Sequence, residues 1–139
     1  MQLDDALTFA RTTNDGVLTT QKRDGRPQLS NITYLADDDG TIRISITTDR
    51  AKYFNLSRDA RASLHVTDAN FGSWVVIEAD AVVAPVSAAP DDHTVEDLVD
   101  LYRRVLGEHP DWTDYRAAMV RERRTVVRLT PTRAYGQLR

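Results

Sequence analysis

The sequence predicts a mainly β protein of the α+β class, in which a small antiparallel β-barrel carries helices on its outside. Several short segments alternate apolar and polar residues, which is the period of a half-buried strand, and Ile42, Ile44 and Ile46 show it clearly. Asp-Gly pairs at 24–25 and 39–40 predict tight turns between neighbouring segments. Roughly six strands in one small domain would leave open edges unless the sheet curls into a barrel.

The strands are expected to follow one another with short turns between them, and the first two form a hairpin. Six segments fit a strand, at 16–20, 27–35, 41–47, 60–67, 74–84 and 125–129.

The helices are expected at both ends of the chain and after the third strand. We predict that Asp4 or Asp5 caps the first helix and that Asp49 caps a short second one. The acidic pair Asp91-Asp92 is interpreted as the N-terminal cap of a third, and the fourth spans 112–122.

The composition indicates one globular domain over residues 1–139. Hydrophobic residues make up 41% of the chain and charged residues 28%, which is ordinary for a globular protein. The net charge of −3 gives no basic footprint for nucleic acid. No apolar run is long enough to span a membrane, and no secretory signal is evident, so we expect a cytoplasmic protein. The chain has no cysteine, which excludes disulfides and thiolate metal sites.

The segment from the third strand into the second helix is the best candidate for a binding site. Arg50 and Lys52 lie in the expected first helical turn, where cations are unfavourable against the helix dipole. A phosphate group would reverse that, because helix N-termini bind anions and arginine can bind them through two hydrogen bonds. The alternative is that both are solvated surface charges near Asp49 and Asp59.

Side-chain catalysis and metal chemistry have little support. There is no nucleophile elbow, phosphate loop or dinucleotide fingerprint. His65, His93 and His109 have no partner at metal-ligand spacing, and we interpret His65 as a structural or surface strand residue. Residues 37–39, all aspartate, are interpreted as a solvated turn. Any chemistry is therefore expected to belong to a bound cofactor.

Several segments together resemble the pyridoxamine 5′-phosphate oxidase-like split β-barrel family. They are G-V-L-T-T at 16–20, D-G-R-P-Q-L-S-N at 24–31, D-R-A-K-Y-F-N-L at 49–56 and the A-Y-G ending at 134–136. The G-S-W, A-A-P-D-D-H and L-Y-R-R-V-L-G-E-H-P-D-W segments are similar to the branch that uses the deazaflavin coenzyme F420, the B group of flavin/deazaflavin oxidoreductases. The chain lacks the longer arginine-containing C-terminal segment of the true vitamin B6 oxidases, so that activity is not expected.

The resemblance implies a split barrel of the FMN-binding-protein type that forms a homodimer, with cofactor sites between the subunits. Arg50 and Lys52 would bind the cofactor phosphate, and Trp74 would reach the site from the loop before its strand, from either subunit. The full set of implied cofactor-binding residues is Pro27, Gln28, Leu29, Ser30, Asn31, Ser45, Ile46, Thr47, Arg50, Lys52, Asn55 and Trp74.

The resemblance leaves three readings of the function. The first is an F420-dependent oxidoreductase that transfers a hydride between the deazaflavin and a conjugated small-molecule acceptor, with no single indispensable catalytic side chain. Tyr34, Phe71 and Trp74 are candidates for the wall of the acceptor site. The second is an FMN-binding oxidoreductase on the same scaffold, and the third is a non-catalytic carrier of F420 or flavin.

Overall fold

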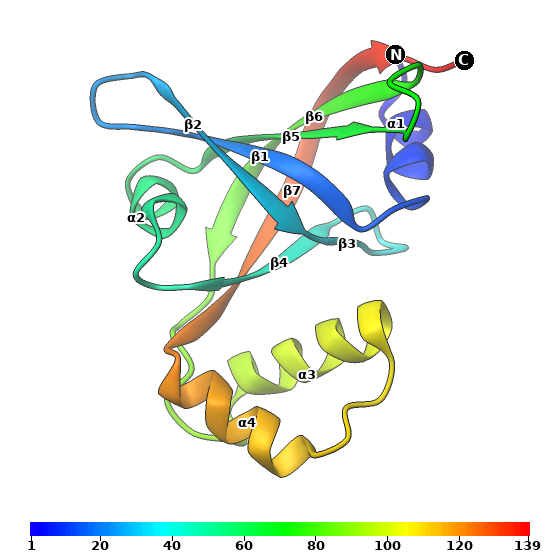
Figure 1. Cartoon of the computed structure of the whole chain (residues 1–139). Coiled ribbons are helices and arrows are strands. Elements are labelled where there is room, and N and C mark those ends of the chain that lie inside the picture. The colour runs from blue at the N-terminus through cyan, green and yellow to red at the C-terminus, as the bar shows by residue number, and fades with distance from the viewer.

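The protein forms one curled antiparallel sheet of seven strands with four helices around it, in a computed structural model that describes all of residues 1–139 (Figure 1). The elements are α1 (Leu3–Ala10), β1 (Asp15–Gln21), β2 (Pro27–Thr33), β3 (Leu35–Ala36), β4 (Ile42–Thr47), α2 (Ala51–Arg58), β5 (Arg61–Thr67), β6 (Trp74–Val83), α3 (His93–Leu106), α4 (Trp112–Arg121) and β7 (Arg124–Gln137). The strand order is β2-β1-β5-β6-β7-β4-β3. The predicted mainly β fold with peripheral helices and a split-barrel sheet is therefore confirmed. None of the four helices is long and apolar enough to cross a membrane.

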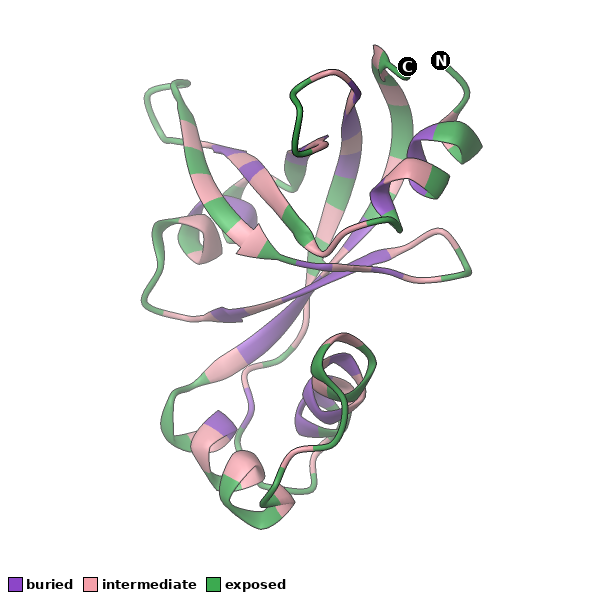
Figure 2. Ribbon diagram, turned by 45° about the vertical axis from the view of Figure 1, so that its right-hand side comes forward, coloured by how far each residue is buried: buried purple, intermediate pink, exposed green.

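The inside of the curled sheet is the main hydrophobic core. It contains eighteen buried residues, drawn from the inner face of the strands and from α1 and α2. Ile42, Ile44 and Ile46 are all buried, as their alternation predicts, and Leu64 and Ile77 face them from β5 and β6. In Figure 2 the buried segments of the strands converge on this interior, while the hairpin tips are exposed.

Helices α3 and α4 form a separate unit at one end of the sheet (Figures 1 and 2). They share a small second core, whose buried residues are Val95, Leu98, Val99, Met119 and, from β7, Val126. The predicted cap of α3 is confirmed for Asp92, whose carboxylate accepts hydrogen bonds from the N–H groups of Val95, Ala88 and Ala89.

Two predicted caps were wrong. Helix α1 begins at Leu3 with Gln2 as its N-cap, so Asp4 and Asp5 lie in its first turn, where they favour the helix dipole without capping it. Helix α2 begins at Ala51 with Arg50 at the N-cap position. No side chain caps α2, because the Asp49 carboxylate accepts a hydrogen bond from the Thr47 hydroxyl instead, at 2.7 Å.

Two predicted strand boundaries also differ. The expected strand 27–35 is divided at Tyr34, whose N–H donates to the Asn14 carbonyl rather than to a neighbouring strand. The last strand does not end before Pro131 but continues to Gln137, because a register shift opposite Glu78 and Ala79 accommodates the proline. Bulges of this kind are places where a strand tolerates proline.

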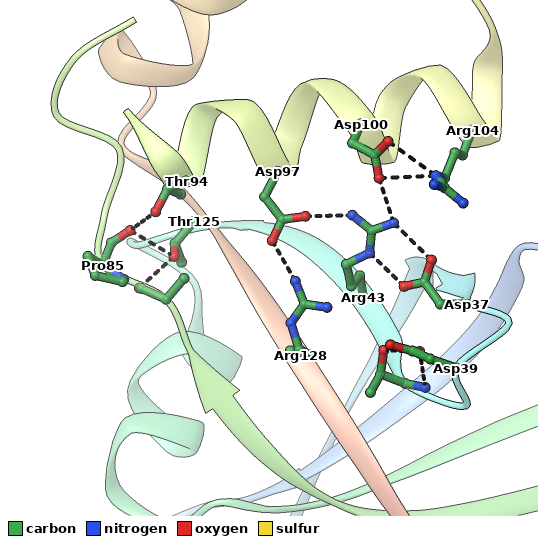
Figure 3. A network of polar contacts seen from close by, with 12 residues as sticks. Asp37, Asp39, Arg43, Pro85, Thr94, Asp97, Asp100, Arg104, Thr125 and Arg128 are labelled. Atoms are coloured by element: carbon green, nitrogen blue, oxygen red, sulfur yellow. Dashed lines mark hydrogen bonds and ion pairs between the residues drawn. The ribbon is translucent and has the colours of Figure 1, made fainter. Parts of the chain in front are cut away.

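Arg43 joins the helical unit to the sheet (Figure 3). Its side chain is only 6% exposed and binds carboxylates of Asp37, Asp97 and Asp100, of which the last two belong to α3. Asp97 also binds Arg128 of β7 at 2.9 Å. The interpretation of 37–39 as a solvated turn was therefore wrong for Asp37, since α3 covers that face of β4 and makes Asp37 part of a partly buried ion cluster.

Candidate functional site

A polar cavity of about 500 Å³ lies between strands β2 and β4 and the start of helix α2. Only two of its ten lining residues are hydrophobic, and the others offer amides, hydroxyls and cations. The ten are Gln28, Ser30, Asn31, Ser45, Ile46, Thr47, Arg50, Ala51, Lys52 and Arg124.

The N-terminus of α2 opens on this cavity without a side-chain cap. Arg50, Ala51 and Lys52, the N-cap and first two residues of the helix, all line the cavity. The first N–H groups of a helix have no partner within the helix and carry the positive end of its dipole. The geometry therefore offers an anion both backbone donors and two cationic side chains.

Three cations surround the cavity, and their mutual repulsion is not fully balanced by acids. Burial lowers the pKa of Lys52, and the nearby charges of Arg50 and Arg124 lower it further. Lys52 makes no ion pair, whereas Arg124 binds Glu122 at 3.1 Å and also donates to the Ser45 hydroxyl at 3.3 Å. An anion bound here would relieve the repulsion and favour the charged form of Lys52.

A line of hydrogen bonds fixes the β2 side of the cavity. Asn55 donates to the Thr20 hydroxyl at 3.1 Å, and Thr20 in turn donates to the Gln28 side-chain carbonyl at 3.1 Å. The Gln28 amide then donates to the Ser30 hydroxyl at 2.9 Å. Asn55 is buried and does not line the cavity, and through Thr20 it is linked to Gln28 and Ser30.

A second, mainly apolar cavity of about 420 Å³ adjoins the first, beneath helices α3 and α4. Nine of its fourteen lining residues are hydrophobic. Asn31, Ser45, Lys52 and Arg124 line both cavities, so the two form one continuous groove. Half of the lining residues of the apolar cavity come from the helical unit, and they are Leu98, Leu101, Tyr102, Val105, Leu106, Tyr115 and Met119.

The structure brings together eight of the twelve residues implied by the resemblance. The eight that line the polar cavity are Gln28, Ser30, Asn31, Ser45, Ile46, Thr47, Arg50 and Lys52. Pro27 and Leu29 alternate along β2 with Gln28 and Ser30 and are exposed, with Leu29 at 59%. Trp74 lies at the start of β6, where its ring packs 6.1 Å from those of His65 and Tyr135 and does not line either cavity.

The other two residues suggested for an acceptor wall, Tyr34 and Phe71, differ in their relation to the cavities. Tyr34 lines the apolar cavity, although its side chain is fully buried and its hydroxyl donates to the Ala10 carbonyl at 2.6 Å. Burial raises the pKa of its hydroxyl strongly. Phe71 is highly exposed in the turn between β5 and β6 and lines neither cavity.

Arg124 is the residue that sequence reasoning missed. It stands opposite Thr47 in the pairing of β4 with β7, which places it beside the polar cavity. It lies in a run of arginines after α4, R-E-R-R at 121–124, and nothing in that run distinguishes it. Only the pairing of two strands that are far apart in the sequence reveals its position.

Comparison with known proteins identifies the family to which the chain belongs. A family model described as pyridoxamine 5′-phosphate oxidase matches residues 3–138. A solved structure of the conserved hypothetical protein Rv2991 from Mycobacterium tuberculosis is similar, with a TM-score of 0.73, 24% identity and coverage of 98% of this chain and 84% of that one. A structure named F420 reductase gives a TM-score of 0.69 and 21% identity over 91% of this chain and 94% of that one.

Other similar structures carry different names. HutZ, described as a heme storage protein from Vibrio cholerae, gives a TM-score of 0.68 and 16% identity, over 97% of this chain and 94% of that one. At these identities the structural likeness shows a shared fold alone.

Proposed function

Because the chain belongs to the pyridoxamine 5′-phosphate oxidase family, we propose that it is an oxidoreductase that binds coenzyme F420 and uses it with a conjugated small molecule. The observation that carries the proposal is the polar cavity, where Arg50, Lys52 and Arg124 surround the uncapped N-terminus of α2. The preference for F420 over FMN rests on the segments that resemble the F420-using branch, at 72–74 and 88–93 among others.

The donor groups of the cavity fit a phosphorylated cofactor. Arg50 and Lys52 would bind the phosphate, together with the first N–H groups of α2, and Arg124 lies within the same cavity. Each charge-assisted hydrogen bond would contribute about 1.5–3 kcal/mol. Ser45 and Thr47 of β4 and the amides of β2 offer hydroxyl and amide partners for the rest of the molecule. When bound, reduced F420 would supply a hydride. The residues of this chain would bind and orient the cofactor and exclude water.

We further propose that the protein acts in the cytoplasm as a homodimer with cofactor sites between the chains. Trp74 and Tyr135 pack together away from the polar cavity of their own chain, and Tyr135 and Phe71 are both exposed. Exposed aromatic side chains are typical of interface residues. In a dimer Trp74 would contact the cofactor held by the partner.

Titration of the purified apo-protein with F420 and with FMN, followed by cofactor fluorescence, tests the proposal directly. Tighter binding of F420 supports the deazaflavin reading. Tighter binding of FMN makes the protein a flavin oxidoreductase with the same phosphate site. If neither binds, the proposed function is wrong.

Replacing Arg50 and Lys52 together by alanine tests the phosphate site. The loss of two charge-assisted contacts is expected to weaken F420 binding on the order of a hundredfold or more. The free energy of unfolding should change little, because neither side chain makes an ion pair and their mutual repulsion is removed. The matched control removes Lys22 and Arg23, which are exposed in the β1–β2 turn and carry the same total charge. Equal affinity in both double variants would overturn the assignment.

A further inference from the structure

The apolar cavity lies at the boundary between the two hydrophobic cores of the molecule. One wall is the sheet, through Ile32 and Ser45, and the other is the helical unit, through residues of α3 and α4. The barrel core and the helical core do not merge here. The two units are joined by the ion cluster of Arg43 with Asp97 and Asp100 of α3 (Figure 3). Arg43 lies two residues before Ser45 on β4, and Asp97 and Asp100 directly precede Leu98 and Leu101, which line the cavity. The space between the two cores is therefore left open as a cavity.

The cavity wall is suited to a flat apolar body. Leu98, Leu101 and Met119 contribute aliphatic surface, while Tyr102 and Tyr115 contribute aromatic rings. These two rings lie edge to face, with centroids 5.0 Å apart, and the Tyr115 hydroxyl is fixed by donation to the Leu98 carbonyl at 3.0 Å. The volume of about 420 Å³ is within the range of about 300–1,000 Å³ typical of small-molecule sites. It is the size of a compact ring system.

The end of the cavity that meets the polar cavity is cationic. Lys52 and Arg124 line it, and Asn31 and Ser45 add an amide and a hydroxyl. The one acid bound to these cations, Glu122, is exposed and pairs with Arg124 from the solvent side. No carboxylate lines the apolar cavity. With a neutral ligand Lys52 would have no counter-charge and Arg124 only the exposed Glu122, whereas an acidic group would provide one inside the cavity.

We propose that the apolar cavity is a binding site for a planar aromatic molecule that carries an acidic group. The rings would lie against α3 and α4, and the acidic group would bind Arg124 at the junction of the two cavities. That such a molecule is the hydride acceptor rests on the proposed function, whereas the binding site itself does not. Arg124 would then determine specificity for the charge of the acceptor, and Tyr102, Val105 and Leu106 would determine its size.

The dye 8-anilinonaphthalene-1-sulfonate is a suitable probe, since it is aromatic, anionic and fluorescent in apolar sites. It is titrated into the folded apo-protein and into a Val105→Trp variant, whose larger side chain fills part of the cavity. The variant is expected to bind the dye at least tenfold more weakly. The matched control is Ala117→Trp, on the exposed side of α4, which should bind within twofold of the unmodified protein. Equal binding by the unmodified protein and Val105→Trp, or no binding by the unmodified protein, would overturn the site.

The acidic group is tested by a second comparison. Arg124→Gln is expected to weaken binding of the sulfonate dye about tenfold, and to leave binding of the uncharged analogue N-phenyl-1-naphthylamine within twofold. An equal loss for both dyes would mean that Arg124 shapes the cavity and does not recognise charge. No loss for the sulfonate dye would overturn the charge assignment outright.

Both tests are made without cofactor, so their outcome is independent of the cofactor titration. Dye binding that depends on Val105, in a protein that binds neither F420 nor FMN, would support the site and remove the proposed function. F420 binding without dye binding would do the reverse. The F420 affinity of Val105→Trp should equal that of the unmodified protein, since Val105 does not line the polar cavity.

Discussion

The curled sheet encloses one continuous core of eighteen buried residues, whereas the helical unit of α3 and α4 has a core of five, one of which belongs to β7. The sheet is therefore held together mainly by buried apolar surface. The helical unit is attached to the sheet through only one residue of that core, Val126, and through polar contacts, among them the Arg43 ion cluster (Figure 3). The Thr94 hydroxyl also donates to the Pro85 carbonyl, after β6, at 2.6 Å. Regions with few buried apolar contacts open at lower free energy than the rest of a protein. We therefore expect the helical unit, which covers the apolar cavity, to open more easily than the sheet.

The two tryptophans of the chain report on the two regions separately. Trp74 belongs to β6 of the sheet and Trp112 to α4. Replacing one or the other by phenylalanine leaves a single fluorescent reporter for each region. Denaturant unfolding of these two reporter proteins measures whether a further substitution affects one region or both.

The largest expected effect is that of Leu64→Ala in the barrel core. Leu64 is fully buried, and its loss is expected to lower the free energy of unfolding by about 2–5 kcal/mol. The unfolding transitions seen by both tryptophans should shift to lower denaturant concentration, because the helical unit cannot stay in place without the sheet. Leu106→Ala is the control, since that side chain is 68% exposed. A shift of the Trp112 transition alone would contradict the claim that the stability of the helical unit depends on the sheet.

Arg43→Met is expected to act on the helical unit more than on the sheet. It removes three ion pairs and leaves Asp37, Asp97 and Asp100 without their common partner, at a cost of about 1–3 kcal/mol. The Trp112 transition should then precede the Trp74 transition. Arg104→Met, which removes a single exposed pair with Asp100, should have little effect. Coincident transitions would show that the Arg43 cluster stabilises the whole molecule equally.

Asp92→Ala removes the cap of α3 and should cost about 1 kcal/mol. Its neighbour Asp91 is exposed and accepts no hydrogen bond, so Asp91→Ala is a matched control. Amide hydrogen exchange should be faster in α3 of Asp92→Ala and unchanged in the sheet. Unchanged exchange in α3 would mean that the cap contributes nothing to the stability of the helical unit.

Acid is expected to loosen the helical unit by a small amount. Burial opposes ionisation of Asp100, but hydrogen bonds from Arg43 and Arg104 more than compensate and hold its pKa below the usual range. A lowered pKa contributes stability that is present above the unfolded value, about 3.9, and is lost as the pH falls through the folded value. The Trp112 reporter should therefore lose stability below about pH 4. Asp100→Asn should reduce this pH dependence, and an unchanged acid response would assign it to other carboxylates.

Local patterns were sufficient to predict most of the fold. The alternation around Ile44 predicts a strand with one buried face, and the Asp-Gly turns predict an antiparallel sheet. The same alternation places Arg43 on the solvent face, where it is in fact buried, because α3 covers that face with Asp97 and Asp100. Those carboxylates are far from Arg43 in the sequence, and no local signal links them to it.

The candidate site was predictable where it is local and not where it is assembled by strand pairing. Arg50 and Lys52 are close in the sequence and remain together in the structure, at the start of one helix. Arg124 reaches them only because β7 pairs with β4. The error at Asp49 has a local cause, since an aspartate just before a helix can cap it or bind a neighbouring hydroxyl, as it does with Thr47.

The position of β7 has a consequence for synthesis on the ribosome. This strand lies between β6 and β4, where Ile42 pairs with Leu129 and Ile46 with Thr125. When β4 emerges, its partner has not been translated, and at about 5–20 residues per second it follows only seconds later. During that interval β4 has only the two-residue strand β3 as a paired neighbour, and its other edge has no partner. We therefore expect chaperones to bind nascent chains that are paused between β4 and β7. Without chaperones, the same chains are expected to aggregate.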